Sequence, residues 1–148
     1  MKRVFLSLAF ATLILSSAIA ADPQPSYAVK QAFEKEFIGI KEVKWQEMSK
    51  RNGIYVASFL FNDETLQAIF TEDGEFLGTT RAISKDQLPI LVLKELSNHY
   101  SNSTIVNIYE HSAPAGLNFY ITISDEKGEQ LLKAAGNGQI TAHKRSKK

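Results

Sequence analysis

The side chains that could bind a metal ion are few in this sequence of 148 residues. Its three histidines are His99, His111 and His143, and no two of them have the i, i+4 spacing that places two ligands on one face of a helix. A zinc site needs three or four converging ligands. We therefore predict that these histidines belong to the surface or to turns, and that the chain holds no metal.

An acidic cluster raises the question of calcium. Glu72, Asp73 and Glu75 crowd one short segment, and Ca²⁺ prefers carboxylate oxygens. No ladder of the D-x-D-x-D-G type accompanies them, however, and Asp73-Gly74 is itself a pair that a tight turn requires. The favoured interpretation is a solvent-exposed turn.

Three signatures of catalytic chemistry are absent from the sequence. No serine lies in a G-x-S-x-G segment, no glycine-rich phosphate loop is present, and the sequence has no cysteine. The lack of cysteine excludes both a thiolate nucleophile and a disulfide framework. We expect no enzyme and no cofactor, and a fold whose stability comes from packing alone.

Apolar and aromatic side chains suggest docking instead. In residues 54–61 both alternating sets are apolar, with Ala57 and Phe59 on one side and Val56 and Leu60 on the other. Side chains alternate between the two faces of a strand, so one set can pack against helices while the other stays available. The same alternation recurs in the segment that contains Phe119, Tyr120 and Ile121.

The set that faces away from the helices is the candidate docking patch. If Phe119 packs inward, Tyr120 points outward. The outward residues that we predict to bind a partner are Tyr109, Tyr120, Met48, Val56 and Ile69. Tyrosine is enriched at interface hot spots. Two other interpretations stay open: scattered apolar residues on a half-solvated sheet, and closure of this face by a homodimer.

Two helices are predicted to cover the other side. Apolar residues recur at helical spacing over residues 26–38, which predicts a helix with Ser26 as its N-cap. Proline lacks an N–H and fits only the first turn of a helix. A second helix is therefore predicted to begin between Lys85 and Pro89 and to run to about Tyr100.

Strands are predicted after each helix. Asp73-Gly74 and Asn137-Gly138, 64 residues apart, both interrupt apolar runs and predict two similar hairpin turns. The predicted strands cover residues 43–48, 54–61, 105–110, 117–124, 130–135 and 139–143, together with the two arms of the hairpin in residues 68–80. The order of one helix and four strands thus occurs twice, which indicates an internal duplication.

The predicted fold class is α+β. Residues 22–148 are expected to form one domain of two repeats, about 22–83 and 84–148, each a helix plus a four-strand antiparallel meander. One such unit alone would leave a sheet edge that another strand must cover. We therefore predict a single sheet of about eight strands, with both helices on one face.

The first 21 residues are predicted to be a cleaved export signal. Lys2 and Arg3 precede an apolar run too short to span a membrane, and small residues follow, so cleavage is expected after Ala20 or, as a second choice, after Ala21. The predicted product is periplasmic or secreted, without an integral membrane segment.

The charge balance argues against a nucleic-acid partner. Of the 17 Lys and Arg, two lie in the predicted signal, so 15 bases face 16 acids and the formal charge becomes −1. Nucleic-acid binding depends on excess positive charge. The basic end, residues 144–148, is expected to be a disordered and solvated tail.

The chain resembles the PepSY-like domains that are grouped with β-lactamase-inhibitor-like (BLIP-like) exported bacterial proteins. The residues that carry the resemblance are Trp45 after a helix that ends at Phe37, Tyr55-x-x-x-Phe59, the hairpin from Ala68 to Phe76, and Leu88-Pro89 before the second helix. It covers essentially the whole chain after the signal, and its motifs are structural.

This resemblance implies a non-enzymatic periplasmic binding module. PepSY-type domains are similar to propeptide segments proposed to restrain peptidases, and inhibitor relatives grip enzymes with a sheet face. Because function does not follow from fold, inhibition is here an analogy alone. The expected function is binding of an unknown protein or peptide through the open sheet face; the alternative is a self-associating structural protein.

Overall fold

The computed structural model describes residues 24–49 and 53–146. In chain order its elements are α1 (Tyr27–Glu36), β1 (Lys44–Ser49), β2 (Ile54–Phe61), β3 (Glu64–Thr71), β4 (Phe76–Ala82), the 3₁₀ turn η1 (Lys85–Gln87), α2 (Ile90–His99), β5 (Thr104–Ala113), β6 (Gly116–Asp125), β7 (Gly128–Ala135) and β8 (Ile140–Ser146). The predicted signal peptide lies outside the described residues. No helix in the described ranges is long and apolar enough to cross a membrane.

The eight strands form one antiparallel sheet. Each strand pairs with the next along the chain, in the order β1 to β8, so the sheet is a continuous meander. Four strands follow each helix. The predicted α+β class, with two helix-plus-meander units merged into one sheet, is confirmed.

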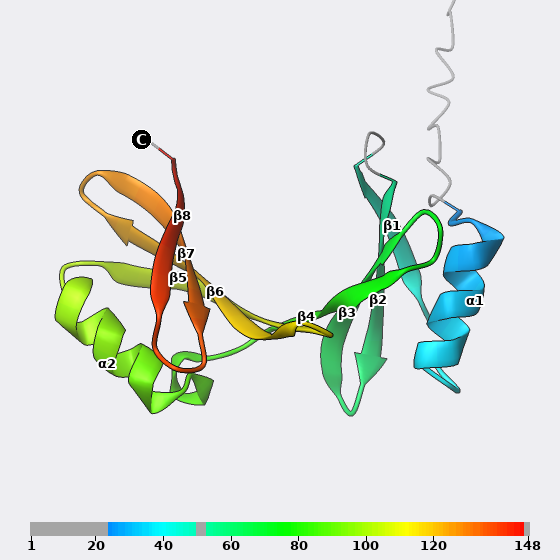
Figure 1. Ribbon diagram of the computed structural model, residues 1–148, viewed down its shortest axis with the longest axis horizontal. Coiled ribbons are helices and arrows are strands. Elements are labelled where there is room, and N and C mark those ends of the chain that lie inside the picture. Colours follow the sequence, from blue (N-terminus) through cyan, green and yellow to red (C-terminus); the bar gives the residue numbers. More distant parts are fainter. Residues whose placement is uncertain (1–23, 50–52, 147–148) are drawn as a thin grey trace, which may run out of the picture.

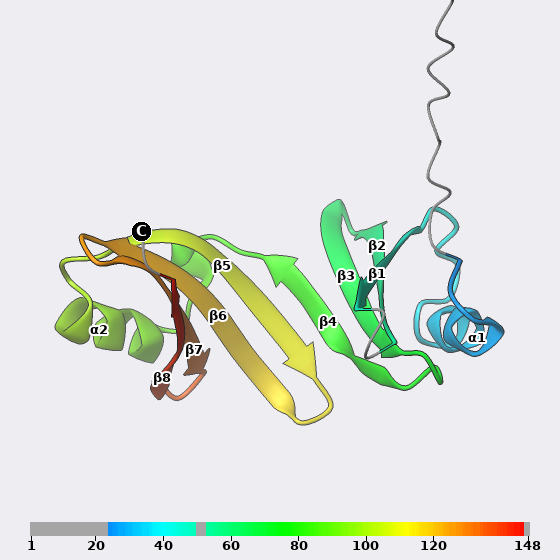
Figure 2. The same ribbon diagram turned by 90° about the horizontal axis from the view of Figure 1, so that it is seen from above.

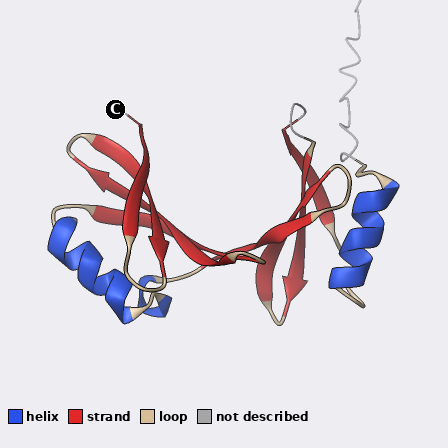
Figure 3. Ribbon diagram, viewed as in Figure 1, coloured by secondary structure: helices blue, strands red, loops and turns tan. Residues whose placement is uncertain are grey.

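The sheet bends into a U, and the helices lie outside it (Figure 1). The view from above shows α1 beyond the strands of the first half and α2 beyond those of the second, so both helices cover the outer face (Figure 2). Figure 3 shows the strands running without interruption between the two helices. No helix of the described residues lies on the inner face of the U, which we call the open face.

Each helix closes a hydrophobic core of its own. The cluster under α1 is rich in phenylalanine and consists of Val29, Phe33, Ala57, Phe59, Ala68 and Phe70. The cluster under α2 is mostly aliphatic and consists of Leu88, Val92, Leu96, Ile108, Phe119, Ile121, Ile123, Leu132 and Ala134. The two clusters share no residue, so the halves are joined by the sheet rather than by a common core.

The two hairpin turns repeat the same hydrogen bonds. At the first turn the Gly74 N–H donates to the Thr71 carbonyl at 2.9 Å, and its counterpart Gly138 donates to Ala135 at 3.0 Å. Both glycines have positive φ, 85° and 91°. Asp-Gly and Asn-Gly are favoured here because glycine adopts this conformation without strain.

The beginning of α2 differs from the prediction. The helix begins at Ile90, and Pro89 is its N-cap rather than a residue of its first turn. Leu88 is held extended, with ψ of 144°, because a residue that precedes proline is sterically barred from the helical region. The Ser84 N–H donates to the Gln87 side chain at 2.9 Å, which closes the separate 3₁₀ turn. For α1, the predicted N-cap is confirmed: Ser26 Oγ accepts from the Val29 N–H.

The basic end also differs from the prediction. A disordered tail was expected from residue 144, but β8 continues to Ser146 and pairs with β7. Lys144 pairs with Leu131 and Arg145 with Gln130. Backbone pairing to a neighbouring strand is available whatever the side chain, so charge alone did not end the strand.

Candidate binding face

The strand register arranges the side chains of the open face in rows. Residues paired across neighbouring strands project from the same face. One row, which we call the central row, crosses from β1 to β7 and is mostly polar: Lys44, Ser58, Gln67, Thr80, His111, Asn118 and Ala135. It runs without interruption from the first half of the molecule into the second.

Two shorter rows lie on opposite sides of the central row. The first flank row belongs to β1 to β4 and consists of Gln46, Val56, Ile69 and Gly78. The second flank row belongs to β5 to β8 and consists of Tyr109, Tyr120, Lys133 and Thr141. Each half therefore presents one row of its own beside the shared polar one.

The structure brings the two predicted tyrosines together. Tyr109 and Tyr120 are direct cross-strand partners on β5 and β6. Tyr109 is 42% exposed, and Tyr120 is half-buried. The His111 ring lies beside Tyr120 in an edge-on arrangement, with ring centroids 6.0 Å apart. Three rings from two strands thus form one aromatic group on the open face.

A glycine supports this aromatic group from β4. Gly78 has φ of 140°, and a Cβ built on it would lie 3.0 Å from His111 Cε1 and 2.5 Å from the Ser112 carbonyl oxygen. Any larger residue would push against β5 at the position of the histidine. Gly78 therefore allows the close approach that holds His111 beside Tyr120.

The predicted residues of the first half are less accessible. Val56 has the expected register on the open face but is only 6% exposed, between its cross-strand neighbours Gln46 and Ile69. Ile69 is half-buried. Met48 lies in a β-bulge of β1, where it has no register partner, and is 62% exposed. This half offers an apolar floor, with Met48 at its edge.

The helix-covered face has a different polar feature, an ion-pair group between the two cores. Arg81 Nε donates to Glu110 Oε1 at 2.9 Å, and Arg81 Nη1 pairs with Glu64 Oε2 at 2.5 Å. Hydrogen bonds from Arg81 to Glu110 and to Glu64 raise the pKa of the guanidinium above its ordinary value. Arg81 therefore stays charged and links strands of both halves, but it cannot transfer a proton near neutral pH.

Three hollows lie away from the aromatic group. One of about 750 Å³ lies by the end of α2 and includes Tyr100; one of about 840 Å³ follows α1 and includes Leu60; one of about 260 Å³ surrounds Arg81. Neither Tyr109 nor Tyr120 lines any of the three. Small molecules prefer enclosed hollows, so the open face is better suited to a macromolecular surface.

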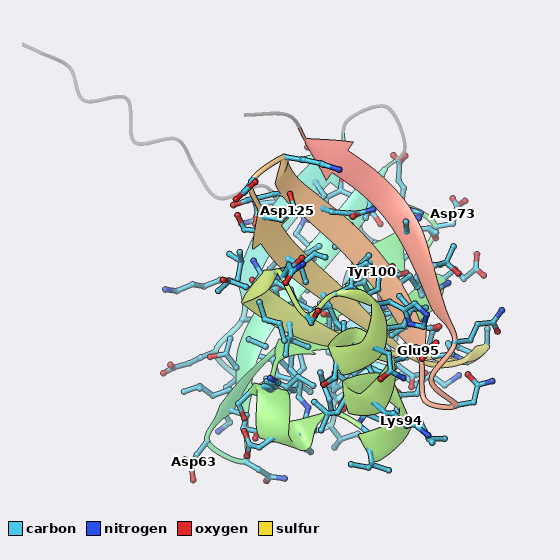
Figure 4. The ribbon with its side chains drawn as sticks, turned by 90° about the vertical axis from the view of Figure 1, so that its left-hand side faces the viewer. Asp63, Asp73, Lys94, Glu95, Tyr100 and Asp125 are labelled. Carbon is cyan, nitrogen blue, oxygen red and sulfur yellow. The ribbon has the colours of Figure 1, made fainter. Side chains whose placement is uncertain are left out.

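The acidic residues do not gather into a metal site. Among the described residues no three His, Asp or Glu side chains lie close enough to hold an ion. Asp63 and Asp73 lie in separate turns and Asp125 ends β6; the three lie at different corners of the molecule, well away from Lys94 and Glu95 on α2 (Figure 4). Glu72, Asp73 and Glu75 are exposed, in agreement with a solvated turn.

One serine and lysine pair has the S-x-x-K spacing of some acylating enzymes, Ser124 and Lys127. It lies at the β6–β7 turn, where the Lys127 N–H donates to Asp125 Oδ1 at 2.8 Å. In those enzymes the motif depends on a helix that places the lysine beside the serine. A tight turn between strands gives no such arrangement.

Two residues of the open face were not singled out from the sequence. His111 was considered only as a metal ligand, and Lys133 was not considered. Both were detectable, because His111 has the same strand parity as Tyr109, and Lys133 alternates with Leu132 and Ala134, which lie in the core. The missing information was the register that places Lys133 opposite Tyr120.

The fold is shared with solved structures of Bacteroides proteins. A BLIP-like protein of Bacteroides fragilis is similar with a TM-score of 0.71 at 20% identity, over 85% of this chain and 89% of that one. A DUF2874 family protein of Bacteroides uniformis gives 0.71 at 17% identity, over 81% and 89%. A Bacteroides eggerthii protein, described provisionally as periplasmic, gives 0.68 at 16% identity, over 81% and 90%.

These likenesses concern the fold alone. No protein-family model matches the sequence, and no curated protein matches it. The resemblance to BLIP-like proteins inferred from the sequence is therefore confirmed at the level of architecture. The PepSY part of the resemblance stays a prediction.

Proposed function

We propose that this chain is an exported, non-enzymatic protein of the periplasm that binds a protein or peptide through its open face. The observation that carries the proposal is the pair formed by Tyr109 and Tyr120, which lies on the helix-free side of a sheet whose other side is closed by two cores. Exposed tyrosines in such a setting are typical binding anchors.

Export is supported from two directions. Residues 1–21 have the composition of a cleaved signal. One structural neighbour is described provisionally as periplasmic. In an oxidising compartment a chain without cysteine is free of unwanted disulfide exchange.

The shape of the sheet supports binding of a convex partner. The inner side of the U is lined by the open face, so a rounded surface or a loop can contact both halves at once (Figure 1). Such contact brings the apolar floor of the first half and the aromatic group of the second half against one partner. Inhibition of a bound enzyme is the form of this function that the BLIP-like name of one neighbour suggests.

Capture from the native periplasm tests the proposal. The double variant Tyr109→Ala/Tyr120→Ala is expected to lose partners that the natural chain retains, as identified by mass spectrometry. Tyr27→Ala is the matched control, because Tyr27 is 76% exposed on α1, outside the U. Unchanged capture by the double variant, with both variants folded, would discard the open face as the binding surface.

Self-association is the second candidate function. The observation in its favour is the exposure of Tyr109 and Met48 at the open face, which a second copy could cover. Sedimentation over a range of concentrations separates the candidates. A monomer mass at every concentration excludes self-association, whereas a dimer that the tyrosine variant abolishes would replace the binding proposal.

A further inference from the structure

The two halves of the open face have different chemistry at matching positions. In the first half, three neighbouring strands present Gln46, Val56 and Ile69 in one row. In the second half, the corresponding three strands present Tyr109, Tyr120 and Lys133. The same architecture therefore carries an apolar floor in one half and hydrogen-bond donors in the other.

Three donor groups of the second half, on Lys133, Tyr109 and Tyr120, have no partner among the described residues. Within residues 24–49 and 53–146, no hydrogen bond or ion pair engages the Lys133 ammonium or the hydroxyls of Tyr109 and Tyr120. His111 contributes a further ring N–H beside Tyr120. Four groups that can donate a hydrogen bond thus lie on neighbouring strands of the open face, and none of them is hydrogen-bonded to another described residue.

Carboxylates are kept away from this group. Of the acids in the described strands, Glu47, Glu64, Glu110 and Asp125 have the register of the helix-covered face. Glu129 has the register of the open face, but it lies four residues from Lys133 along β7, roughly 13 Å in an extended strand. Among the described strands, the centre of the open face therefore carries the positive charge of Lys133 with no acid beside it.

We propose that the partner presents an acidic segment, with Asp or Glu side chains opposite Lys133, His111 and the two tyrosines and with apolar side chains against Ile69. This inference rests on the proposed function and specifies its partner. Carboxylates accept strong hydrogen bonds from lysine, tyrosine and histidine. A positive surface also favours encounter with an acidic partner and disfavours a basic one.

The occupant is a segment of another protein rather than a small anion. A small anion needs converging donors in an enclosed site, whereas the donors here are spread over β5, β6 and β7 on an open sheet. Lys133 lies on β7 in the second half and Ile69 on β3 in the first half, so only an extended or bulky partner can contact both at once.

The test selects short random peptides, displayed on phage, on the immobilised exported chain. Selected peptides are expected to be enriched in Asp and Glu next to apolar residues. Lys133→Glu should weaken a selected acidic peptide about tenfold and should shift a repeated selection toward Lys and Arg. Lys127→Glu makes the same charge change at the exposed β6–β7 turn and should leave both results unchanged.

The outcomes separate this inference from the proposed function. Peptides that depend on Tyr109 and Tyr120 but show no acidic enrichment, or that ignore Lys133→Glu, would overturn the inference and leave the proposed function standing. Absence of any tyrosine-dependent peptide would count against both. A dimer of the chain that Lys133→Glu dissociates would identify a second copy as the occupant and overturn the inference. Lys133→Gln replaces the Glu variant if the latter fails to fold.

Discussion

The two halves of this molecule share their order of elements but fill their cores differently. Under α1, Phe33 packs edge-on against Phe59 with ring centroids 5.1 Å apart, and its ring also meets Phe70 and Trp45. Under α2, the equivalent space holds mainly leucine, isoleucine and valine. The same helix-on-meander arrangement thus tolerates aromatic or aliphatic packing, provided that volume and patterning are kept.

The two halves also differ in where they place their aromatic residues. The first half has most of its rings in the core and aliphatic residues on the open face. The second half has a mostly aliphatic core, with Phe119 as its buried ring, and carries Tyr109, His111 and Tyr120 on the open face. The two halves are thus scaffolds of one kind, and the proposed binding function depends on the residues that the second half exposes.

The largest effect is expected from emptying either core. Phe70→Ala should lower the free energy of unfolding by about 4 kcal/mol, because Phe70 is fully buried among other rings. Leu132→Ala in the second half should cost about 3 kcal/mol. Denaturant unfolding measures both values.

Amide hydrogen exchange then shows whether the loss of stability from a core variant stays within one half of the sheet. Because the cores share no residue, Phe70→Ala should speed amide exchange mainly in β1 to β4. Equal acceleration in β5 to β8 would contradict two separately packed halves. Phe70→Leu is the milder variant if the alanine chain does not fold.

A smaller and asymmetric effect is expected at the two turn glycines. A Cβ on Gly74 would lie 2.7 Å from the Ala28 carbonyl oxygen of α1, whereas one on Gly138 would lie 3.1 Å from the Leu91 carbonyl oxygen of α2. Gly74→Ala should therefore destabilise by about 2 kcal/mol and Gly138→Ala by about 1 kcal/mol.

Substitution of a third glycine, Gly39, distinguishes the cost of backbone strain from the cost of a steric contact. Gly39 also has positive φ, but no atom lies within 4 Å of the position that a Cβ would take there. Gly39→Ala should thus report the backbone strain alone. Thermal unfolding that gives one value for Gly39→Ala and Gly74→Ala would show that the contact with α1 contributes nothing.

The ion-pair group between the halves should matter less. Arg81→Met removes the link to Glu64 and Glu110 and should cost about 1 kcal/mol or less, because the Arg81 side chain is partly exposed and water screens the pairs. The loss should shrink at high salt. Thermal unfolding at low and high ionic strength checks this, and an effect that salt does not change would indicate packing rather than charge.

The smallest effect on stability is expected at the binding face. Tyr109→Ala/Tyr120→Ala should change the free energy of unfolding by about 0.5 kcal/mol, since both side chains lie outside the cores. Circular dichroism and denaturant unfolding provide the measurement. A loss comparable to that of Leu132→Ala would mean that these tyrosines stabilise the fold instead of serving a partner.

Much of the fold could be predicted because its signals are local. Asp73-Gly74 and Asn137-Gly138 fix two turns, and alternation in residues 54–61 gives β2 with its observed bounds. The break at Leu88-Pro89 was missed because the proline rule allowed the helix to begin earlier, while the Gln87 side chain closes a separate turn. The hydrogen bond from the Ser84 N–H to the Gln87 side chain therefore favours a separate 3₁₀ turn over an earlier start of α2.

The candidate site depended on register, which is not local. Bulges at Met48 in β1 and between Ile105 and Asn107 in β5 shift the pairing. The neighbours that bury Val56 and place Lys133 opposite Tyr120 come from different strands. The alternation of side chains along a strand identified Tyr109 and Tyr120 as outward residues. Only the observed strand pairing shows that they lie next to each other and beside His111.

Footprinting of the captured complex tests the central claim most directly. Hydroxyl-radical labelling with mass spectrometry compares Tyr109, on the open face, with Tyr27, which is exposed on α1, before and after a partner binds. Our account predicts protection of Tyr109 with Tyr27 labelled as before. Protection of Tyr27 while Tyr109 stays fully labelled would contradict it.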